Sequence, residues 1–136
     1  MMQAIVSAAP DQEHSAVLEY AGEIRFGPAF YTLVVDKISF GKRVFGNKFL
    51  WSPDSRYFAI QEWETVSESL GPQTRLLLID LEAGRECILS KAEQGFIIPQ
   101  KFEDGKLVYT KEYHGPGIIS EFEIDFLSLK IWENIK

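Results

Sequence analysis

Apolar and polar residues alternate along most of the chain, and the apolar runs are short. A period of two places successive side chains on opposite faces of a strand, and the 3.6-residue period of an amphipathic helix is hard to find. Clusters of Gly, Pro, Asp and Ser separate the runs, as they do in hairpin turns. Such short connections exclude crossover helices, so the pattern predicts an all-β chain of antiparallel meanders. Only residues 90–95 leave room for one helical turn.

The pattern also repeats. Gly-Pro pairs occur three times, 44 residues apart, and each is followed by an apolar run that ends in aspartate. The pairs are Gly27-Pro28, Gly71-Pro72 and Gly115-Pro116, and the aspartates are Asp36, Asp80 and Asp125. Upstream, "APDQEHSAVLEY" aligns without a gap with "SPDSRYFAIQEW", and "FEDGKLVYTKEY" is a shorter third copy. We therefore predict one domain of three four-stranded units, residues 1–45, 46–92 and 93–136.

The second unit carries the clearest motifs, "WSPDSRYFAI" followed by "RLLLIDLEAG". They resemble the blade repeat of β-propellers of the Tol-system periplasmic protein and of the prolyl-oligopeptidase type, with Ser55 in place of a usual glycine. The resemblance implies blade-like sheets and no particular chemistry, because propellers host many functions. Pro53 presets a tight turn and the Asp54 carboxylate can accept hydrogen bonds from nearby amides. We therefore interpret this corner as structural, with Trp51 pointing into a neighbouring layer.

Closed propellers have about four to eight blades, so three units are too few for a closed ring of this kind. The sequence is compatible with a closed barrel or sandwich, with an open partial ring, and with a homodimer that completes a ring of six. An open flank would expose strand faces and aromatic side chains. We therefore expect a compact closed form or a homodimer.

Charge narrows the class of partner. The chain has 136 residues, 20 of them acidic and 14 basic, and a formal net charge of −6. This balance disfavours nucleic acid and favours encounter with a basic protein. The single cysteine, Cys87, lacks a disulfide partner and is predicted to be a small buried hydrophobe. Neither a secretory signal nor a membrane span is recognisable, so we expect a cytoplasmic protein without membrane contact.

Candidate catalytic groups are few. His14 lies in a predicted turn and His114 in the "YHGPG" loop, and the chain has neither ligand spacing for a metal nor a nucleophile elbow. We therefore predict no catalytic residue, no metal site and no cofactor.

Charged side chains repeat along the predicted strands. Glu19, Glu62 and Glu112 each precede an aromatic residue and are expected to be strand-end carboxylates facing solvent. "EFEID", with Glu121, Glu123 and Asp125, predicts an acidic stripe on one strand face without a metal-binding loop. The basic cluster at residues 41–48 predicts a solvated edge strand.

Loops at one end of the units are the expected binding surface. If the units are blades, the connections after their second and fourth strands share one rim, and "ETVSESLG" is its longest polar loop. Glutamates there would attract a basic partner and aromatic residues would anchor it. The predicted contact residues are Trp63, Glu64, Glu68, Glu93, Tyr113 and His114.

These features predict a non-enzymatic protein-binding module, of the inhibitor or immunity type, that occludes a basic partner. One alternative is a small hydrolase or isomerase, which would need His114 beside a carboxylate in a deep pocket. The other is a structural repeat protein that completes a ring by dimerisation.

Overall fold

The computed structural model describes residues 4–25, 27–67, 69, 71–113 and 117–135, and the fold is all-β with antiparallel strands, as predicted. The first strands are β1 (Ala4–Ala8), β2 (Ser15–Glu23), β3 (Ala29–Val35), β4 (Ile38–Ser39), β5 (Val44–Trp51) and β6 (Tyr57–Trp63). They are followed by β7 (Gln73–Asp80), β8 (Arg85–Glu93), β9 (Gly95–Glu103), β10 (Lys106–Tyr113) and β11 (Ile118–Asp125). A 3₁₀ turn, η2 (Phe126–Ser128), precedes β12 (Glu133–Asn134). Residues 90–93 continue β8, so the helical turn considered there is absent.

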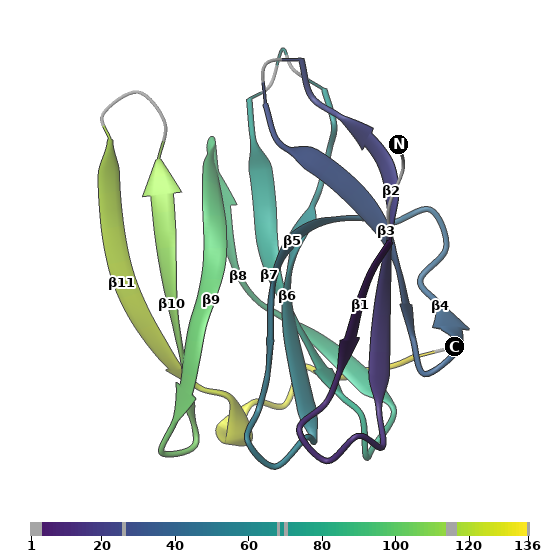
Figure 1. Ribbon diagram of the computed structural model, residues 1–136. Coiled ribbons are helices and arrows are strands. Elements are labelled where there is room, and N and C mark those ends of the chain that lie inside the picture. The colour runs from purple at the N-terminus through teal and green to yellow at the C-terminus, as the bar shows by residue number, and fades with distance from the viewer. Residues whose placement is uncertain (1–3, 26, 68, 70, 114–116, 136) are drawn as a thin grey trace.

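The strands form two sheets (Figure 1). The larger sheet has the order β1-β2-β3-β5-β6-β7-β8-β12, with β4 beside β3, and the smaller has the order β11-β10-β9. Neither sheet closes into a barrel. The chain returns to the larger sheet at its end, because β12 pairs with β8.

The larger sheet folds over on itself at β5. Strands β3 and β5 share a single residue pair in register, Tyr31 with Phe45, and a bulge interrupts the pairing of β5 with β6 between Phe45 and Phe49. Strands β2 and β3 consequently lie over one face of β6 and β7, where they enclose the first core. Its buried members are Ala16, Leu18, Leu33, Val35, Phe40, Phe45, Phe58, Ile60, Leu77 and Ile79. The expected boundary at residues 45 and 46 falls inside β5, a single strand that serves both units.

The opposite face of β6 and β7 packs against the smaller sheet and η2. The second core contains Tyr57, Ala59, Leu76, Leu78, Ala92, Ile97, Leu107, Tyr109 and Phe126. Alternate residues of β6 therefore enter different cores, and every residue of this strand is buried. Both faces of β6 and β7 are covered, which explains their nearly continuous apolar sequence.

Strand β9 meets the larger sheet with the edge that does not pair with β10. Gln61 Nε2 donates to the carbonyl of Ile97 at 3.0 Å. Thr74 Oγ1 accepts from the amide of Ile97 at 2.9 Å and donates to the carbonyl of Gly95 at 2.8 Å. Gln61 and Thr74 are both buried. Two side chains thus take the place of a neighbouring strand at Gly95 and Ile97, the buried start of this edge.

The Trp-Ser-Pro-Asp corner between β5 and β6 is built from local hydrogen bonds, as predicted. Ser52 Oγ accepts from the amide of Tyr57 at 2.9 Å and donates to Asp54 at 2.5 Å. The same Asp54 carboxylate accepts from the amide of Arg56 at 3.1 Å. The polar groups of Ser52 and Asp54 therefore form hydrogen bonds within the turn itself.

The corner also contacts the first unit. Trp51 Nε1 donates to Ser7 Oγ in β1 at 2.9 Å, so the indole does reach a neighbouring layer. Ser55 adopts a left-handed backbone with φ of 65°, and its hydroxyl accepts from the amide of Asp11 at 2.9 Å. The two Pro-Asp turns are therefore hydrogen-bonded to each other.

Candidate functional site

The hairpins β2–β3, β6–β7 and β10–β11 all close at the same end of the molecule, at the top in Figure 1. The β8–β9 turn lies there too, because the amide of Gly95 donates to the carbonyl of Pro72 at 2.9 Å. We call this end, formed by the four connections β2–β3, β6–β7, β8–β9 and β10–β11, the rim. The rim expected from the sequence also included residues 45–47, but these residues lie within β5 and form no connection.

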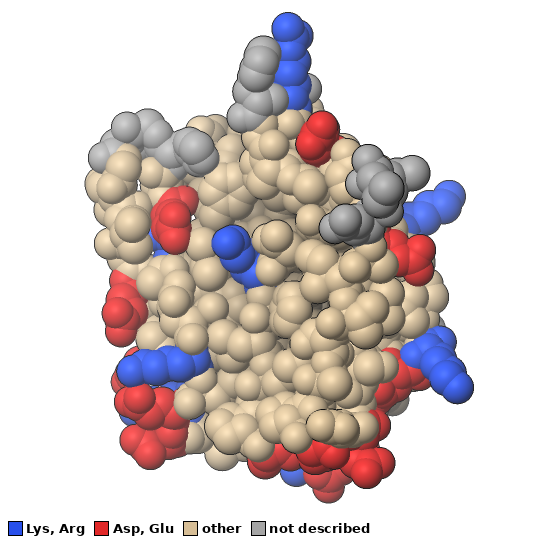
Figure 2. All heavy atoms as spheres, in the orientation of Figure 1, with Lys and Arg blue, Asp and Glu red and all other residues tan. Residues whose placement is uncertain are grey.

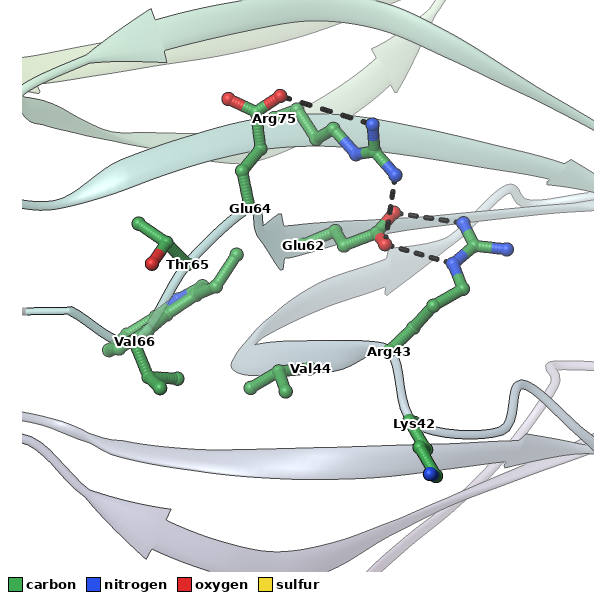
Figure 3. A pocket seen from close by; sticks show the side chains of 9 residues that line it. Lys42, Arg43, Val44, Glu62, Glu64, Thr65, Val66 and Arg75 are labelled. Carbon is green, nitrogen blue, oxygen red and sulfur yellow. Dashed lines mark hydrogen bonds and ion pairs between the residues drawn. The ribbon is translucent and has the colours of Figure 1, made fainter.

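A cleft of about 550 Å³ opens at the rim beside the β6–β7 connection (Figure 3). It is lined by Lys42, Arg43, Val44, Glu62, Trp63, Glu64, Thr65, Val66 and Arg75. Two of the predicted contact residues, Trp63 and Glu64, are therefore part of one concave surface. Charged side chains from β6, β7 and the segment before β5 make up much of its lining.

Glu62 is the buried carboxylate of this cleft, only 2% exposed. Arg43 binds both of its oxygens, with two hydrogen bonds of 2.9 Å, and Arg75 donates a third of 3.1 Å. Figure 3 shows the two guanidinium groups on either side of the carboxylate. The expectation that Glu62 faces solvent is therefore wrong. Its position on β6 continues the face of Phe58 and Ile60, so its side chain points to the end of the first core.

The protonation of Glu62 follows from these contacts. Burial alone would raise the pKa of its carboxyl group, but hydrogen bonds and positive charge from Arg43 and Arg75 outweigh burial and hold the pKa below the ordinary 4.5. The same pairing raises the pKa of Arg43. A carboxylate that stays ionised and has both oxygens engaged is poorly suited to act as a general acid at neutral pH.

The charges extend outward from Glu62 as one network. Arg43 Nη1 lies 2.8 Å from Glu86 Oε1, and Arg75 Nη1 lies 3.9 Å from Glu64 Oε1. Glu64 also pairs with Lys91 at 3.1 Å. Three carboxylates thus meet three cations and balance in charge. Bidentate arginine pairs fix side-chain geometry, so the network gives the cleft a rigid wall.

The remaining lining supplies apolar surface and one separate cation. Val66, on the β6–β7 connection, is 43% exposed, and Val44 is half-buried. Lys42 is exposed and extends away from the Glu62 network in Figure 3. An exposed valine beside fixed charges is an arrangement suited to contact with another protein.

Trp63 contributes to the site from the interior. It is 5% exposed, and its ring centroid lies 5.9 Å from that of Phe30 and 6.1 Å from that of Phe96. Its indole N–H donates to Gln61 Oε1 at 2.7 Å. Trp63 therefore supports the cleft and presents little surface to a partner.

Two other predicted contact residues lie elsewhere on the rim. Glu93 is exposed at the end of β8, where it pairs in register with Gln73. Tyr113 is half-buried at the end of β10, opposite Ile118. Glu68 and His114 lie outside the described residues.

Sequence reasoning missed Arg43 and Arg75 as members of the site. Residues 41–48 were expected to mark a solvated edge strand, but β5 is internal, between β3 and β6. The available signal was the pairing across the β6–β7 hairpin, which sets Arg75 directly opposite Glu62. No local pattern brings Arg43 to the same carboxylate, because that contact depends on the fold of the sheet at β5.

A second buried carboxylate lies at the opposite end of β7. Asp80 is fully buried and accepts two hydrogen bonds from Arg56, at 3.0 and 3.1 Å, and one from Arg85 at 3.0 Å. Its equivalent Asp36 accepts from the amide of Ser15 at 2.9 Å, and its other carboxylate oxygen lies 2.6 Å from His14 Nδ1. These repeated aspartates hold turns together.

Within the part of the chain that the structure describes, no group of three or more His, Cys, Asp or Glu side chains could hold a metal ion. In the same residues, no helix is long and apolar enough to cross a membrane. In comparisons with known proteins, no family model, no curated protein and no solved structure matches this chain.

Proposed function

We propose that this chain is a non-enzymatic module that binds another protein through the rim, as an inhibitor or immunity protein occludes a basic partner. The observation that carries the proposal is the cleft at the β6–β7 connection, where fixed charged side chains stand beside the exposed Val66. This combination resembles the centre of a protein interface, in which apolar contact is surrounded by oriented polar groups.

The network around Glu62 favours binding over chemistry. Its carboxylate is held ionised by Arg43 and Arg75, so it does not exchange a proton near neutral pH. Side chains that are already fixed lose little conformational entropy when a partner arrives, and this lowers the free-energy cost of association. The net charge of −6 would speed encounter with a basic protein.

The test compares two substitutions of matched exposure in full-length protein. Val66→Arg alters the cleft wall, whereas Ile38→Arg alters a residue of β4 away from the rim; the two side chains are 43% and 45% exposed. The tagged proteins are used to capture partners from cells of the source organism and are mixed with the products of adjacent genes. We expect the captured partner to be basic, to be released by added salt, and to be lost with Val66→Arg alone.

Two results would contradict the proposal. One is that no protein is retained by the wild type even at low ionic strength. The other is that Val66→Arg and Ile38→Arg retain the partner equally well while both unfold at the wild-type temperature.

A further inference from the structure

We infer that β11 is a docking edge for an extended segment of the partner that carries Lys or Arg at alternate positions. The inference rests on the proposed function and specifies its partner chemistry. The partner segment would add a strand beside β11, next to the rim at Ile118.

The first support is the open edge itself. Strand β11 pairs with β10 over eight consecutive residue pairs without a break, and with no other described strand. Alternate N–H and C=O groups of β11 therefore face away from the sheet. At the opposite edge of the same sheet, Gln61 and Thr74 satisfy the backbone groups of Gly95 and Ile97 at the start of β9. The end strands of the larger sheet, β1 and β12, have only five and two residues.

The second support is the side chains that flank this edge. β11 contains no proline, lysine or arginine, so only its acidic side chains discourage edge pairing, and a basic partner strand would neutralise them. β11 also exposes apolar side chains: Ile118 is 53% exposed, Ile119 66% and Phe122 39%. Phe122 is already held in place, stacked on Tyr109 with ring centroids 5.5 Å apart and with Lys111 Nζ 5.0 Å from its centroid. An added strand would cover this apolar surface.

The third support is charge, which selects the occupant. Glu121, Glu123 and Asp125 alternate on one face of β11, and every charge on the strand is negative. Glu123 forms an ion pair with Lys106 of β10, with 3.2 Å between nitrogen and oxygen. Figure 2 shows carboxylates, with Lys or Arg side chains among them, on the left side, where β11 lies in Figure 1. Opposite charges on paired strands are stabilising and like charges are destabilising.

The acidic stripe on β11 also disfavours a second copy of the chain as the occupant of the docking edge. In antiparallel pairing of β11 with itself, paired residues point to the same face. The registers centred on residues 121, 122 and 123 therefore place Glu121 opposite Glu121, Glu123 and Asp125, respectively. A basic partner strand avoids this repulsion and places its cations beside the carboxylates, while its alternate apolar residues cover Ile118 and Phe122.

The experiment uses fluorescein-labelled peptides and full-length protein, with binding read by fluorescence anisotropy. The probe alternates Lys with Val and has about eight residues, the length of β11. Three comparison peptides replace Lys by Glu, group the lysines at one end, or carry N-methyl groups on alternate amides. We expect the alternating Lys peptide to bind at least about tenfold more tightly than each of them, because charge, alternation and backbone pairing all contribute. Hydrogen exchange at the outward amides of β11 should slow when this peptide binds.

A matched pair of variants locates the site. Ile119→Lys places a cation on the edge, and Ile131→Lys makes the same change in the C-terminal segment; both isoleucines are 66% exposed. Ile119→Lys should lower the affinity of the protein for the alternating Lys peptide by about five- to tenfold. Ile131→Lys should leave this affinity unchanged. Should Ile119→Lys fail to fold, Glu121→Lys replaces it, with the exposed Glu19→Lys on β2 as its control.

Each adverse outcome has a separate meaning. Equal binding of the Lys, Glu and N-methylated peptides, or equal effects of Ile119→Lys and Ile131→Lys, would overturn the docking edge. A wild-type dimer in sedimentation that Ile119→Lys makes monomeric would identify a second copy as the occupant and would also overturn it. Loss of the captured partner with Val66→Arg but not with Ile119→Lys would leave the proposed function standing and reject this inference. Peptide binding at β11 without any captured partner would instead reject the proposed function.

Discussion

Thr74 binds the edge of β9 at Ile97, whose amide donates a hydrogen bond of 2.9 Å to Thr74 Oγ1. The joint between the two sheets is therefore polar and directional, although Ile97 belongs to the second apolar core. A hydroxyl donates and accepts at once, so Thr74 also satisfies the carbonyl of Gly95. This joint sets the position of the smaller sheet, and with it that of β11.

Replacement of Thr74 by Val should loosen the joint. The change preserves shape but leaves the amide of Ile97 and the carbonyl of Gly95 without their hydroxyl partner in the interior. We expect the free energy of unfolding in urea to fall by about 2–4 kcal/mol. Thr32→Val, at a half-buried threonine of β3, is the control and should change stability by less than about 0.5 kcal/mol. Equal losses in the two variants would show that the hydroxyl of Thr74 carries no special role.

Glu62 should make stability depend on pH. Its pKa lies below 4.5 in the folded protein and returns near 4.5 on unfolding. Its contribution is therefore complete above about pH 6 and is lost as pH falls through 4.5 toward the lowered folded value. Glu62→Gln should destabilise the protein at pH 7 by about 3–5 kcal/mol, because two arginines lose their buried partner. It should also flatten the decline in stability between about pH 6 and pH 3, measured by urea unfolding at each pH.

Two features keep that measurement interpretable. Asp80 also has a lowered pKa, since hydrogen bonds from Arg56, Ala83 and Arg85 outweigh its burial, so some acid dependence should remain in Glu62→Gln. Glu121→Gln, at an exposed carboxylate, should follow the wild-type curve. A Glu62→Gln curve parallel to the wild type would contradict a lowered pKa at Glu62.

Two substitutions of Ser55 distinguish the energetic cost of backbone strain from the contribution of a side-chain hydrogen bond. Its left-handed φ of 65° is strained for any residue but glycine, and its hydroxyl accepts from Asp11. Ser55→Ala keeps the strain and loses the bond, so we expect a loss of about 1–2 kcal/mol. Ser55→Gly loses the same bond but removes strain of about 1 kcal/mol, so it should unfold at a higher temperature than Ser55→Ala. The reverse order would mean that the turn does not strain Ser55.

Cys87 should be unreactive in the folded protein. It is 3% exposed, and burial raises the pKa of its thiol, so little thiolate forms at neutral pH. We expect a thiol reagent such as dithiobis-nitrobenzoate to label it very slowly in buffer and fully in urea. Rapid labelling without urea would indicate that β8 opens readily in the native state.

Local sequence patterns were sufficient to predict the class of fold and the positions of several turns. Short apolar runs identified β6 and β7, and the Pro-Asp and Gly-Pro motifs located hairpins, because these signals depend on residues close together in the chain. The burial of Cys87 and the exposed acidic stripe on β11 were predicted on the same local grounds.

The grouping of the strands and the pairing of the buried charges depend on the three-dimensional fold. Glu62 was expected in solvent, yet it is buried between Arg43 and Arg75 because the larger sheet folds at β5. The contacts of Thr74 and Gln61 with β9 likewise join residues far apart in the chain. Periodicity assigns a side chain to a face, but it does not say which other element covers that face. Which element covers a face depends on packing between residues far apart in the chain, and local sequence patterns do not predict that packing.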